Sequence, residues 1–209
     1  LAPESPIGWY GWALAHQSQG DLARTVVGYR KAIEQDPGDH EMVSAVGSLW
    51  LDLGDLERAD EWLTRAEVTG AGEPVTTWRR VDYLNSVERM DLAADLARRS
   101  LESDMEDRFG ALFFMRTTWA AWNLSQGRHE EALRFHREIL PWAFETPFDP
   151  PGDLARWNGD VVTIATVLRR ADPLSTRPDE LLDALERALE DSRLPPSWGP
   201  WSDALTQAM

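Results

Sequence analysis

Cysteine is absent from this chain of 209 residues. Disulfide bonds, thiolate zinc sites and cysteine nucleophiles are therefore excluded. The redox compartment stays open, because a chain without cysteine suits either side of a membrane. Lysine is almost absent too, since Lys31 is the one lysine among 21 basic residues. No apolar run approaches the ~18 to 20 residues that span a bilayer, and no basic start precedes an apolar stretch as in a signal peptide.

Positive charge is also scarce, because 36 acidic residues give a formal net charge of −15. Such a field repels phosphate backbones and anionic lipids, so we expect neither nucleic acid nor a membrane surface as a partner, and no membrane insertion. It favours protein partners that carry basic patches. A hydrophobic content of 43% with 27% charged residues is typical of a folded chain. The sequence does not fix the compartment; it slightly favours the cytoplasm, with the periplasm as the alternative if the chain belongs to a larger exported protein.

What the sequence does contain is a repeat. Gly20-Asp21-Leu22 returns as Gly54-Asp55-Leu56 after 34 residues, and Gly127 stands in the same context further on. A fixed period of this length is typical of stacked-repeat proteins rather than of one closed core. Four units follow from it, at residues 6–39, 40–73, 74–107 and 113–146.

Small residues recur in phase across these units. They allow two helix backbones to approach closely, as in an antiparallel hairpin. The in-phase sets are Ala13, Gly47, Val81 and Ala120; Thr25, Ala59, Ala93 and Ala132; and Ala32, Ala66, Ser100 and Ile139.

The spacing of the apolar residues predicts two helices in each unit. Apolar side chains three or four residues apart share one helix face. Two such faces are Leu56, Ala59, Leu63 and Ala66, and Leu22, Thr25, Val26, Tyr29, Ala32 and Ile33.

Turn residues separate the predicted helices. Gly20, Gly54 and Gly127 suit the left-handed conformation that ends a helix. Asp21 and Asp55 are placed to cap the next helix by accepting hydrogen bonds from its free amides. The pair Asp36-Pro37 closes the first unit, because a residue before proline is pushed out of helical geometry.

At these positions the chain resembles the tetratricopeptide-repeat (TPR) family over residues 6–146. The resemblance implies an all-α, right-handed α-solenoid of about four helical hairpins, with further helices after them. The residues that carry it are Trp9, Ala13, Gly20, Tyr29, Ala32 and Pro37 in the first unit, Gly47, Trp50, Gly54, Ala59 and Ala66 in the second, and Ala120, Gly127 and Ala132 in the fourth.

The third unit departs from the pattern. Arg80 stands where a large apolar residue is usual, and Glu88 replaces the turn glycine. Sliding the frame by one residue brings Trp78 to the aromatic position but puts Asp82 where a small residue belongs. The unshifted frame is preferred because it turns these residues inward: Val81, Leu84, Met90, Ala93 and Ala97.

Residues 147–152 are rich in proline and mark a break. Helices are expected over 153–170, over 178–192 with a proline in the first turn, and from about 200 to 209. The last of these ends without a cap. We therefore expect the segment 153–209 to continue or cap the solenoid, and the chain to be a piece of a longer protein.

In the TPR family, the first helices of successive units line a groove that holds ligands. Arg79 is the one residue here that fits the positions at which some members clamp a terminal carboxylate, which disfavours a chaperone-tail adaptor. Carried over by position, the implied groove contains Tyr10, Leu14, Gln17, Ser44, Ser48, Trp78, Arg79, Asp82, Asn85, Thr117 and Ala121.

Tryptophan is abundant, with 11 residues. The pairs Trp9/Trp12 and Trp119/Trp122 are interpreted as packing between helices, with an aromatic wall for a ligand as the alternative. Trp78 is the preferred aromatic residue for binding.

No pattern predicts catalysis, a metal or a cofactor. His129 and His136 are seven residues apart without a third ligand, and His136 is expected to fill a packing position. Phosphate-binding glycine loops and nucleophile elbows are missing.

The sequence therefore predicts a non-enzymatic scaffold that binds a peptide or protein segment. One alternative is a regulatory or sensory segment of a larger bacterial multidomain protein, such as a transcriptional regulator or an enzyme with a TPR tail. The other is a catalytic site within 148–209.

Overall fold

A computed structural model describes residues 4–106, 110–152 and 154–191. Within these ranges the chain is helical, without β-strands. It divides into two compact units, Leu1–Leu112 and Phe113–Met209. The first three predicted repeats therefore lie in unit 1 and the fourth lies in unit 2. No helix in the described ranges combines the length and the apolar character that crossing a bilayer requires.

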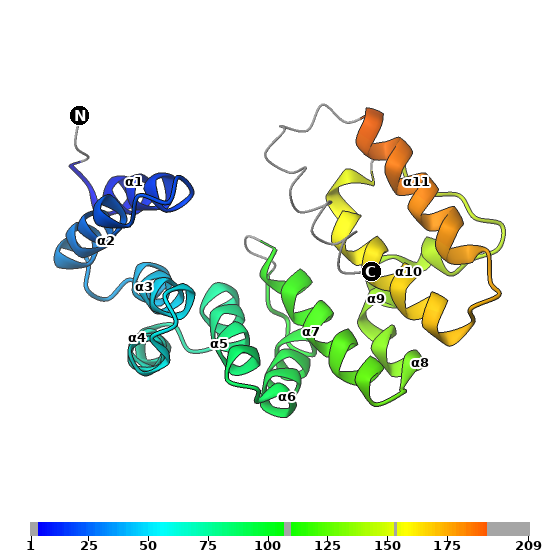
Figure 1. Cartoon of the computed structure of the whole chain (residues 1–209), viewed down its shortest axis with the longest axis horizontal. Helices are drawn as coiled ribbons and strands as arrows, with labels where there is room; N and C mark the ends of the chain where they lie inside the picture. Colours follow the sequence, from blue (N-terminus) through cyan, green and yellow to red (C-terminus); the bar gives the residue numbers. More distant parts are fainter. Residues whose placement is uncertain (1–3, 107–109, 153, 192–209) are drawn as a thin grey trace. The chain divides into compact units, whose positions relative to one another are not determined.

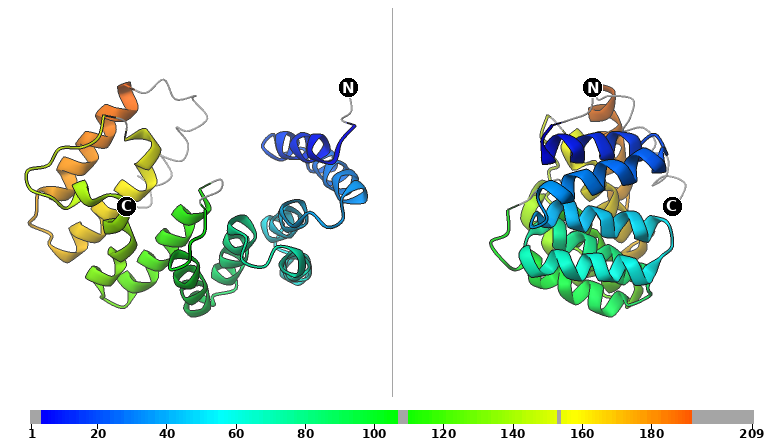
Figure 2. Two further views of the ribbon diagram at one scale, coloured as in Figure 1. Left: turned by 180° about the vertical axis from the view of Figure 1, so that it is seen from behind. Right: turned by 90° about the vertical axis from the view of Figure 1, so that its left-hand side faces the viewer.

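Unit 1 is a series of three helical hairpins. In each hairpin the two helices pack against each other. Helices α1, α3 and α5 form one row and α2, α4 and α6 form the other (Figure 1), and the hairpins follow in chain order from every side shown in Figure 2. The bounds are α1 (Pro6–Gln17), α2 (Leu22–Gln35), α3 (His40–Asp52), α4 (Leu56–Thr69), α5 (Pro74–Ser86) and α6 (Met90–Leu101).

The turns inside the first two hairpins are confirmed. Gly20 and Gly54 adopt left-handed φ angles of 73° and 78°. The Asp21 side chain accepts a hydrogen bond from the amide of Arg24, and the Asp55 side chain accepts one from the amide of Arg58, both at 3.1 Å. Glycine followed by aspartate therefore ends one helix and begins the next.

The third hairpin makes the same turn without glycine. Glu88 has a φ of 59°, and no other described non-glycine residue has a positive φ. Its backbone amide and that of Arg89 bond to the carbonyls of Asn85 and Leu84, as in the glycine turns. The position is thus conformationally the same as Gly20 and Gly54, at a steric cost to the glutamate.

We expect Glu88→Gly to raise the free energy of unfolding by about 0.5 to 1 kcal/mol, because relief of the left-handed strain outweighs the added entropy of the unfolded chain. Urea unfolding measures the change. Gln19→Gly is the control, since Gln19 lies in the corresponding turn of the first hairpin but not at a positive φ. It is expected to lower stability slightly. A loss of stability in Glu88→Gly would contradict this interpretation of the turn.

Small residues bring the paired helices together, as the repeat predicted. A Cβ added to Gly47 would lie 2.7 Å from Cγ of Leu63 in the facing helix, and one added to Gly28 would lie 2.8 Å from Cβ of Ala13. Ala59 and Ala93 are completely buried. These positions have no room for a larger side chain.

Ala59→Leu is accordingly expected to destabilise the protein by about 1 to 3 kcal/mol through overpacking. Ala23→Leu serves as the control, because Ala23 is exposed on α2. Thermal unfolding of the two variants beside the parent chain measures the difference, and equal melting of both would refute the predicted frame.

Arg80 stands at a repeat position where a large apolar residue is usual, and hydrogen bonds rather than apolar packing hold it there. Its guanidinium is buried and donates to both carboxylate oxygens of Glu67 at 2.9 Å, to Asp60 at 2.5 Å and to Thr64 at 2.9 Å. Burial acts to lower the pKa of Arg80, but the hydrogen bonds that it donates to Glu67 and Asp60 raise that pKa above its ordinary value. Helix α5 is thereby fixed to α4 through charge-assisted bonds.

The expected inward residues of unit 1 are partly corrected. Val81, Ala93 and Ala97 are buried, but Met90 is 39% exposed at the first residue of α6. Leu22, Val26 and Leu56 are exposed as well, because each lies at the edge of its helix's apolar stripe. The preferred frame of the third repeat therefore holds in the interior of the helices.

Unit 2 has its own apolar core, which includes Leu133, Leu140, Leu154, Ile164 and Leu181. Its α-helices are α7 (Ala111–Ser125), α8 (His129–Ala132), α9 (Arg134–Ile139), α10 (Asn158–Ala171) and α11 (Arg177–Asp191), and its 3₁₀ turns are η1 (Pro141–Ala143) and η2 (Ala155–Trp157).

The fourth repeat differs from the expected pair of continuous helices. Gly127 makes the predicted left-handed turn, with a φ of 70°. The second helix is interrupted at Leu133, whose amide is shared between the carbonyls of His129 and Glu130. It ends at Ile139 because Leu140 precedes a proline.

The two helices expected after the break are present with shifted bounds. Helix α10 begins at Asn158 rather than near 153, and α11 carries Pro178 in its first turn as predicted. Arg177 fixes the start of α11 by donating to the carbonyls of Ala143, Trp142 and Glu145. The helix expected over 200–209 lies outside the described residues.

Candidate functional site

The predicted groove residues of unit 1 come from α1, α3 and α5, and we name this side the α1–α3–α5 face. Leu14 and Asp82 are exposed on it, whereas Ser44 and Arg79 are buried. The others are half-buried: Tyr10, Gln17, Ser48, Trp78 and Asn85.

Arg79 links the three helices of the face. Its guanidinium donates to the carbonyl of Glu41 at 2.6 Å, to Oγ of Ser44 at 2.5 Å and to the Tyr10 hydroxyl at 3.2 Å. Its Cζ atom lies 5.9 Å from the centroid of the neighbouring Trp78 ring. Arg79 thus spans from α5 across α3 to α1.

The sequence predicts that Ser44 and Arg79 contact a ligand, but in the structure both side chains are buried. Ser44 is 0% exposed, and Arg79 is 9% exposed with its donors directed at protein oxygens. The two side chains hold the helices in place because a buried guanidinium needs several acceptors.

A second polar chain runs along the same face. The Tyr29 hydroxyl donates to Oε1 of Gln17 at 2.5 Å, and Nε2 of Gln17 donates to Oδ2 of Asp52 at 3.3 Å. Burial raises the pKa of Tyr29 above its ordinary value, with a smaller contribution from Tyr10. Tyr29 therefore stays a neutral hydrogen-bond donor.

Asp52 and Asp82 place two carboxylates near each other on this face. Desolvation raises the pKa of Asp82, and the negative charge of Asp52 raises it further. Asp52 is the last residue of α3, and it accepts a hydrogen bond from Nε2 of Gln17. The two carboxylates are thus held against their mutual repulsion, in a position that suits a cation from outside.

Sequence reasoning included Asp82 but missed Asp52. The repeat frame puts Ser48 in phase with Asp82, and Asp52 lies one helical turn beyond Ser48. A search for acidic residues one turn from each frame position would have found it.

Thr117 and Ala121 lie on α7 in unit 2, half-buried and exposed respectively. They are therefore described apart from the α1–α3–α5 face, and their place in a groove stays a prediction.

One tryptophan of each pair, Trp12 and Trp119, packs against a second helix; a Cβ added to Gly28 of α2 would lie 2.9 Å from Cε3 of Trp12. The Trp9 and Trp12 rings make an edge contact with centroids 5.6 Å apart, and Trp119 is buried with Nε1 donating to the carbonyl of Glu131.

The interior of unit 2 holds a charged cluster. Arg116 of α7 donates from Nε and Nη2 to the two oxygens of Asp160 on α10, at 2.9 and 3.0 Å. His136 of α9 is 0% exposed, with Nε2 3.4 Å from Oδ1 of Asp160. Desolvation lowers the pKa of His136 to about 4. All three side chains are buried and lie close to one another, so the cluster joins α7, α9 and α10.

In the described ranges, no three acidic or histidine side chains are grouped as a metal ion would require.

Comparison with known proteins gives the class of the fold. No family model and no curated protein matches the sequence. Among solved structures, PilF of Pseudomonas aeruginosa is similar with a TM-score of 0.66 and 13% identity, over 88% of this chain and 76% of that one.

Two further neighbours agree. A chain of the APC/C hetero-tetramer Cut9–Hcn1 has a TM-score of 0.59 and 15% identity, over 88% of this chain but 36% of the other. YrrB, described as a TPR protein with an unusual peptide-binding site, has a TM-score of 0.51 and 17% identity, over 90% and 88%. The chain is thus an all-α helical-repeat protein with a TPR-like fold.

Proposed function

We propose that this chain is a non-enzymatic scaffold that binds an extended segment of a partner protein on the α1–α3–α5 face. The observation that carries the proposal is the pair of neighbouring carboxylates, Asp52 and Asp82: desolvation raises the pKa of Asp82, and repulsion by the negative charge of Asp52 raises it further. A lysine or arginine of the partner would lie between them and remove that repulsion.

The rest of the face supplies what an extended segment needs beside a charge. Trp78 and Tyr10 offer half-buried aromatic surface, and Leu14 offers exposed aliphatic surface. Aromatic side chains contribute most of the energy in such contacts, whereas the charges set specificity and the rate of association. The excess of acidic residues over the whole chain steers a basic partner toward it.

The structural neighbours support this proposal at the level of the fold. YrrB carries a peptide-binding site by its own description. Buried charged groups such as Arg79 and Asp160 are engaged in bonds within the protein, which favours a binding role over catalysis.

The proposal is tested with a dye-labelled peptide of repeated Arg-Ala-Ala triplets and fluorescence anisotropy. We expect it to bind, and a peptide of Glu-Ala-Ala triplets not to bind. Asp82→Asn and Asp52→Asn are each expected to weaken binding about 3- to 10-fold, the loss of one charge-assisted bond. Affinity should also fall with added salt.

Glu57→Gln is the matched control, because Glu57 is exposed on α4, away from this face. It removes the same charge and should leave affinity unchanged apart from a small general effect. Trp78→Ala should weaken binding more than it lowers the melting temperature. Equal losses in Glu57→Gln and Asp82→Asn would mean that only net charge matters, and the proposed site would be wrong.

A further inference from the structure

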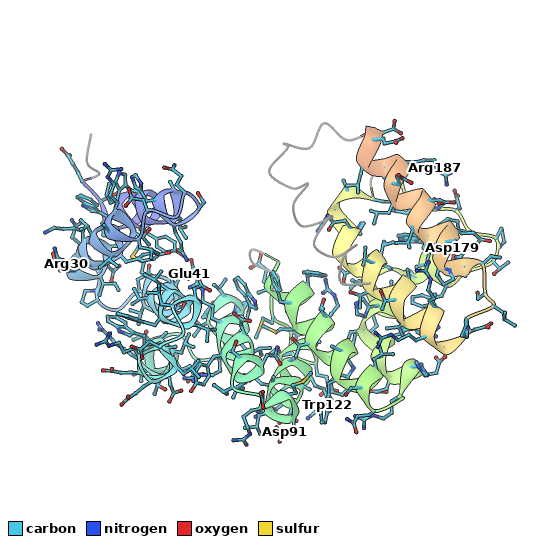
Figure 3. All side chains as sticks on the ribbon, viewed as in Figure 1. Arg30, Glu41, Asp91, Trp122, Asp179 and Arg187 are labelled. Atoms are coloured by element: carbon cyan, nitrogen blue, oxygen red, sulfur yellow. The ribbon has the colours of Figure 1, made fainter. Side chains whose placement is uncertain are left out.

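A cavity of about 510 Å³ lies on the other row of unit 1, between α2 and α4 with α3 as its floor. Figure 1 shows these helices, and Figure 3 labels Arg30 at the outer edge of unit 1, beside the cavity. Its volume is in the range of ligand pockets. We name it the α2–α4 pocket, with Val26, Ile33, Trp50, Glu61, Trp62 and Arg65 as defining residues.

The walls of the pocket are apolar. Val26 and Ile33 from α2 face Trp50 from α3 and Trp62 from α4. Val26 is 48% exposed, although its helix spacing predicted burial. Residues 26, 30 and 33 follow one face of α2, and 58, 62 and 65 follow one face of α4. Two helix faces of adjacent repeats thus leave apolar surface uncovered between them.

Most charges at the rim are already paired. Arg30 lies 3.7 Å from a carboxylate oxygen of Glu34, and Arg58 lies 3.3 Å from one of Asp55. Glu61 and Arg65 are the exceptions, because neither forms an ion pair with any residue in the described part of the chain.

Glu61 and Arg65 stand one turn apart on α4, in the order that favours a salt bridge between them. The Arg65 guanidinium instead lies 4.9 Å from the centroid of the Trp62 ring, with one long hydrogen bond of 3.4 Å to the carbonyl of Pro37. The pocket mouth therefore offers a carboxylate that accepts and a guanidinium that donates, side by side.

An extended peptide matches this pair. Four residues of helix advance by about 6 Å, and two residues of extended chain advance by about 6.8 Å. One backbone N–H of the peptide can thus donate to Glu61, and a backbone carbonyl about two residues further along can accept from Arg65. The side chain between those two groups is then beside the cavity.

We propose that the α2–α4 pocket binds an extended peptide segment of a partner protein, inserting one bulky apolar side chain while Glu61 and Arg65 bond to the flanking main chain. This site is separate from the α1–α3–α5 face. The charges of Glu61 and Arg65 cancel, so the pocket favours a ligand without net charge. The α1–α3–α5 face, in contrast, favours basic residues.

The chemistry of the rim selects a peptide over a free acid. The rim arginines are exposed, and exposed charges contribute little affinity on their own. Affinity comes from burying an apolar group in the pocket. An isolated carboxylate would be attracted by Arg65 and repelled by Glu61, whereas an amide satisfies both.

The test titrates N-acetyl-phenylalanine N-methylamide into the full chain labelled with a nitrogen isotope, and follows the indole N–H signals by NMR. The signals of Trp50 and Trp62, assigned with tryptophan-to-phenylalanine variants, should shift and saturate. Glu61→Gln and Arg65→Gln should each weaken binding about 3- to 10-fold. N-acetyl-glycine N-methylamide, which lacks the side chain, should produce no saturable shift.

Val26→Glu should abolish binding by placing a charge in the pocket, and Val27→Glu is its matched control. Val27 is the next residue on α2, is 39% exposed and does not line the pocket. Equal binding by these two variants, or shifts that do not include both indoles, would overturn the proposal. Binding of phenylpropionate as tight as that of the amide would also overturn it, in favour of an anion site. Asp82→Asn should leave the probe's affinity unchanged, so the two proposed sites stand or fall separately.

Discussion

Replacing Asp160 by asparagine is expected to lower the free energy of unfolding of unit 2 by about 3 to 5 kcal/mol. The Arg116 and Asp160 side chains are 7% and 4% exposed and share two hydrogen bonds of 2.9 and 3.0 Å. Removing the carboxylate charge leaves the guanidinium buried without its counter-charge, in surroundings that cannot solvate it. The contact between Arg116 of α7 and residue 160 of α10 then destabilises the folded state instead of stabilising it.

Hydrogen exchange of the α10 amides, with urea unfolding of the whole chain beside it, measures the loss. Asp179→Asn is the matched control. Asp179, labelled on α11 in Figure 3, pairs with Arg169 at 2.5 Å, but its side chain is 70% exposed. Exposed pairs contribute about 0 to 1 kcal/mol. The double variant Arg116→Met with Asp160→Leu should recover most of the stability, because it removes both charges together. If Asp160→Asn costs no more than Asp179→Asn, the buried pair does not have the role assigned to it.

The local features of the fold could be predicted because their causes are local. Gly20 and Gly54 had to adopt left-handed angles, and Asp21 had to cap the helix after them, since each effect involves residues within one turn of chain. The period of the repeat then gave the order of the hairpins. Composition and spacing carried that information without any knowledge of distant contacts.

Glu88 and Arg80 show where local rules stop. Glu88 is a poor residue for a left-handed turn, yet the hairpin that encloses it imposes the angle. Arg80 is a poor residue for an interior position, yet Glu67 and Asp60 on α4 supply the bonds that let it lie there. The Arg80 bonds join residues 13 and 20 positions apart, which a helix spacing does not encode.

The candidate site, too, could be predicted from the sequence only in part. Position in the repeat placed Leu14, Trp78 and Asp82 at the surface of the α1–α3–α5 face. It could not show that Arg79 turns inward, because that depends on acceptors from α1 and α3. It also gave no sign of the α2–α4 pocket, which exists because two helix faces fail to cover each other.

The second large effect is a loss of stability of unit 2 in acid, caused by His136. In the folded protein, desolvation lowers the pKa of His136 to about 4 against an ordinary value of 6.5. Below pH 6.5 the unfolded chain therefore binds a proton that the folded chain does not bind. Stability is fully present above pH 6.5 and falls as the pH is lowered toward 4, by on the order of 3 kcal/mol in total.

His136→Met should flatten this pH dependence, because methionine fills a similar volume and does not titrate. Urea unfolding at intervals between pH 7 and pH 4.5 measures the slope for both proteins. The comparison uses slopes rather than absolute stabilities, so the packing cost of the substitution cancels. His129→Met controls for removal of a histidine from the neighbouring helix α8. An unchanged slope in His136→Met would assign the acid sensitivity to carboxylates instead. A flattened slope would show that a neutral histidine, held beside the Arg116–Asp160 pair, makes the packing of α9 against α10 dependent on pH.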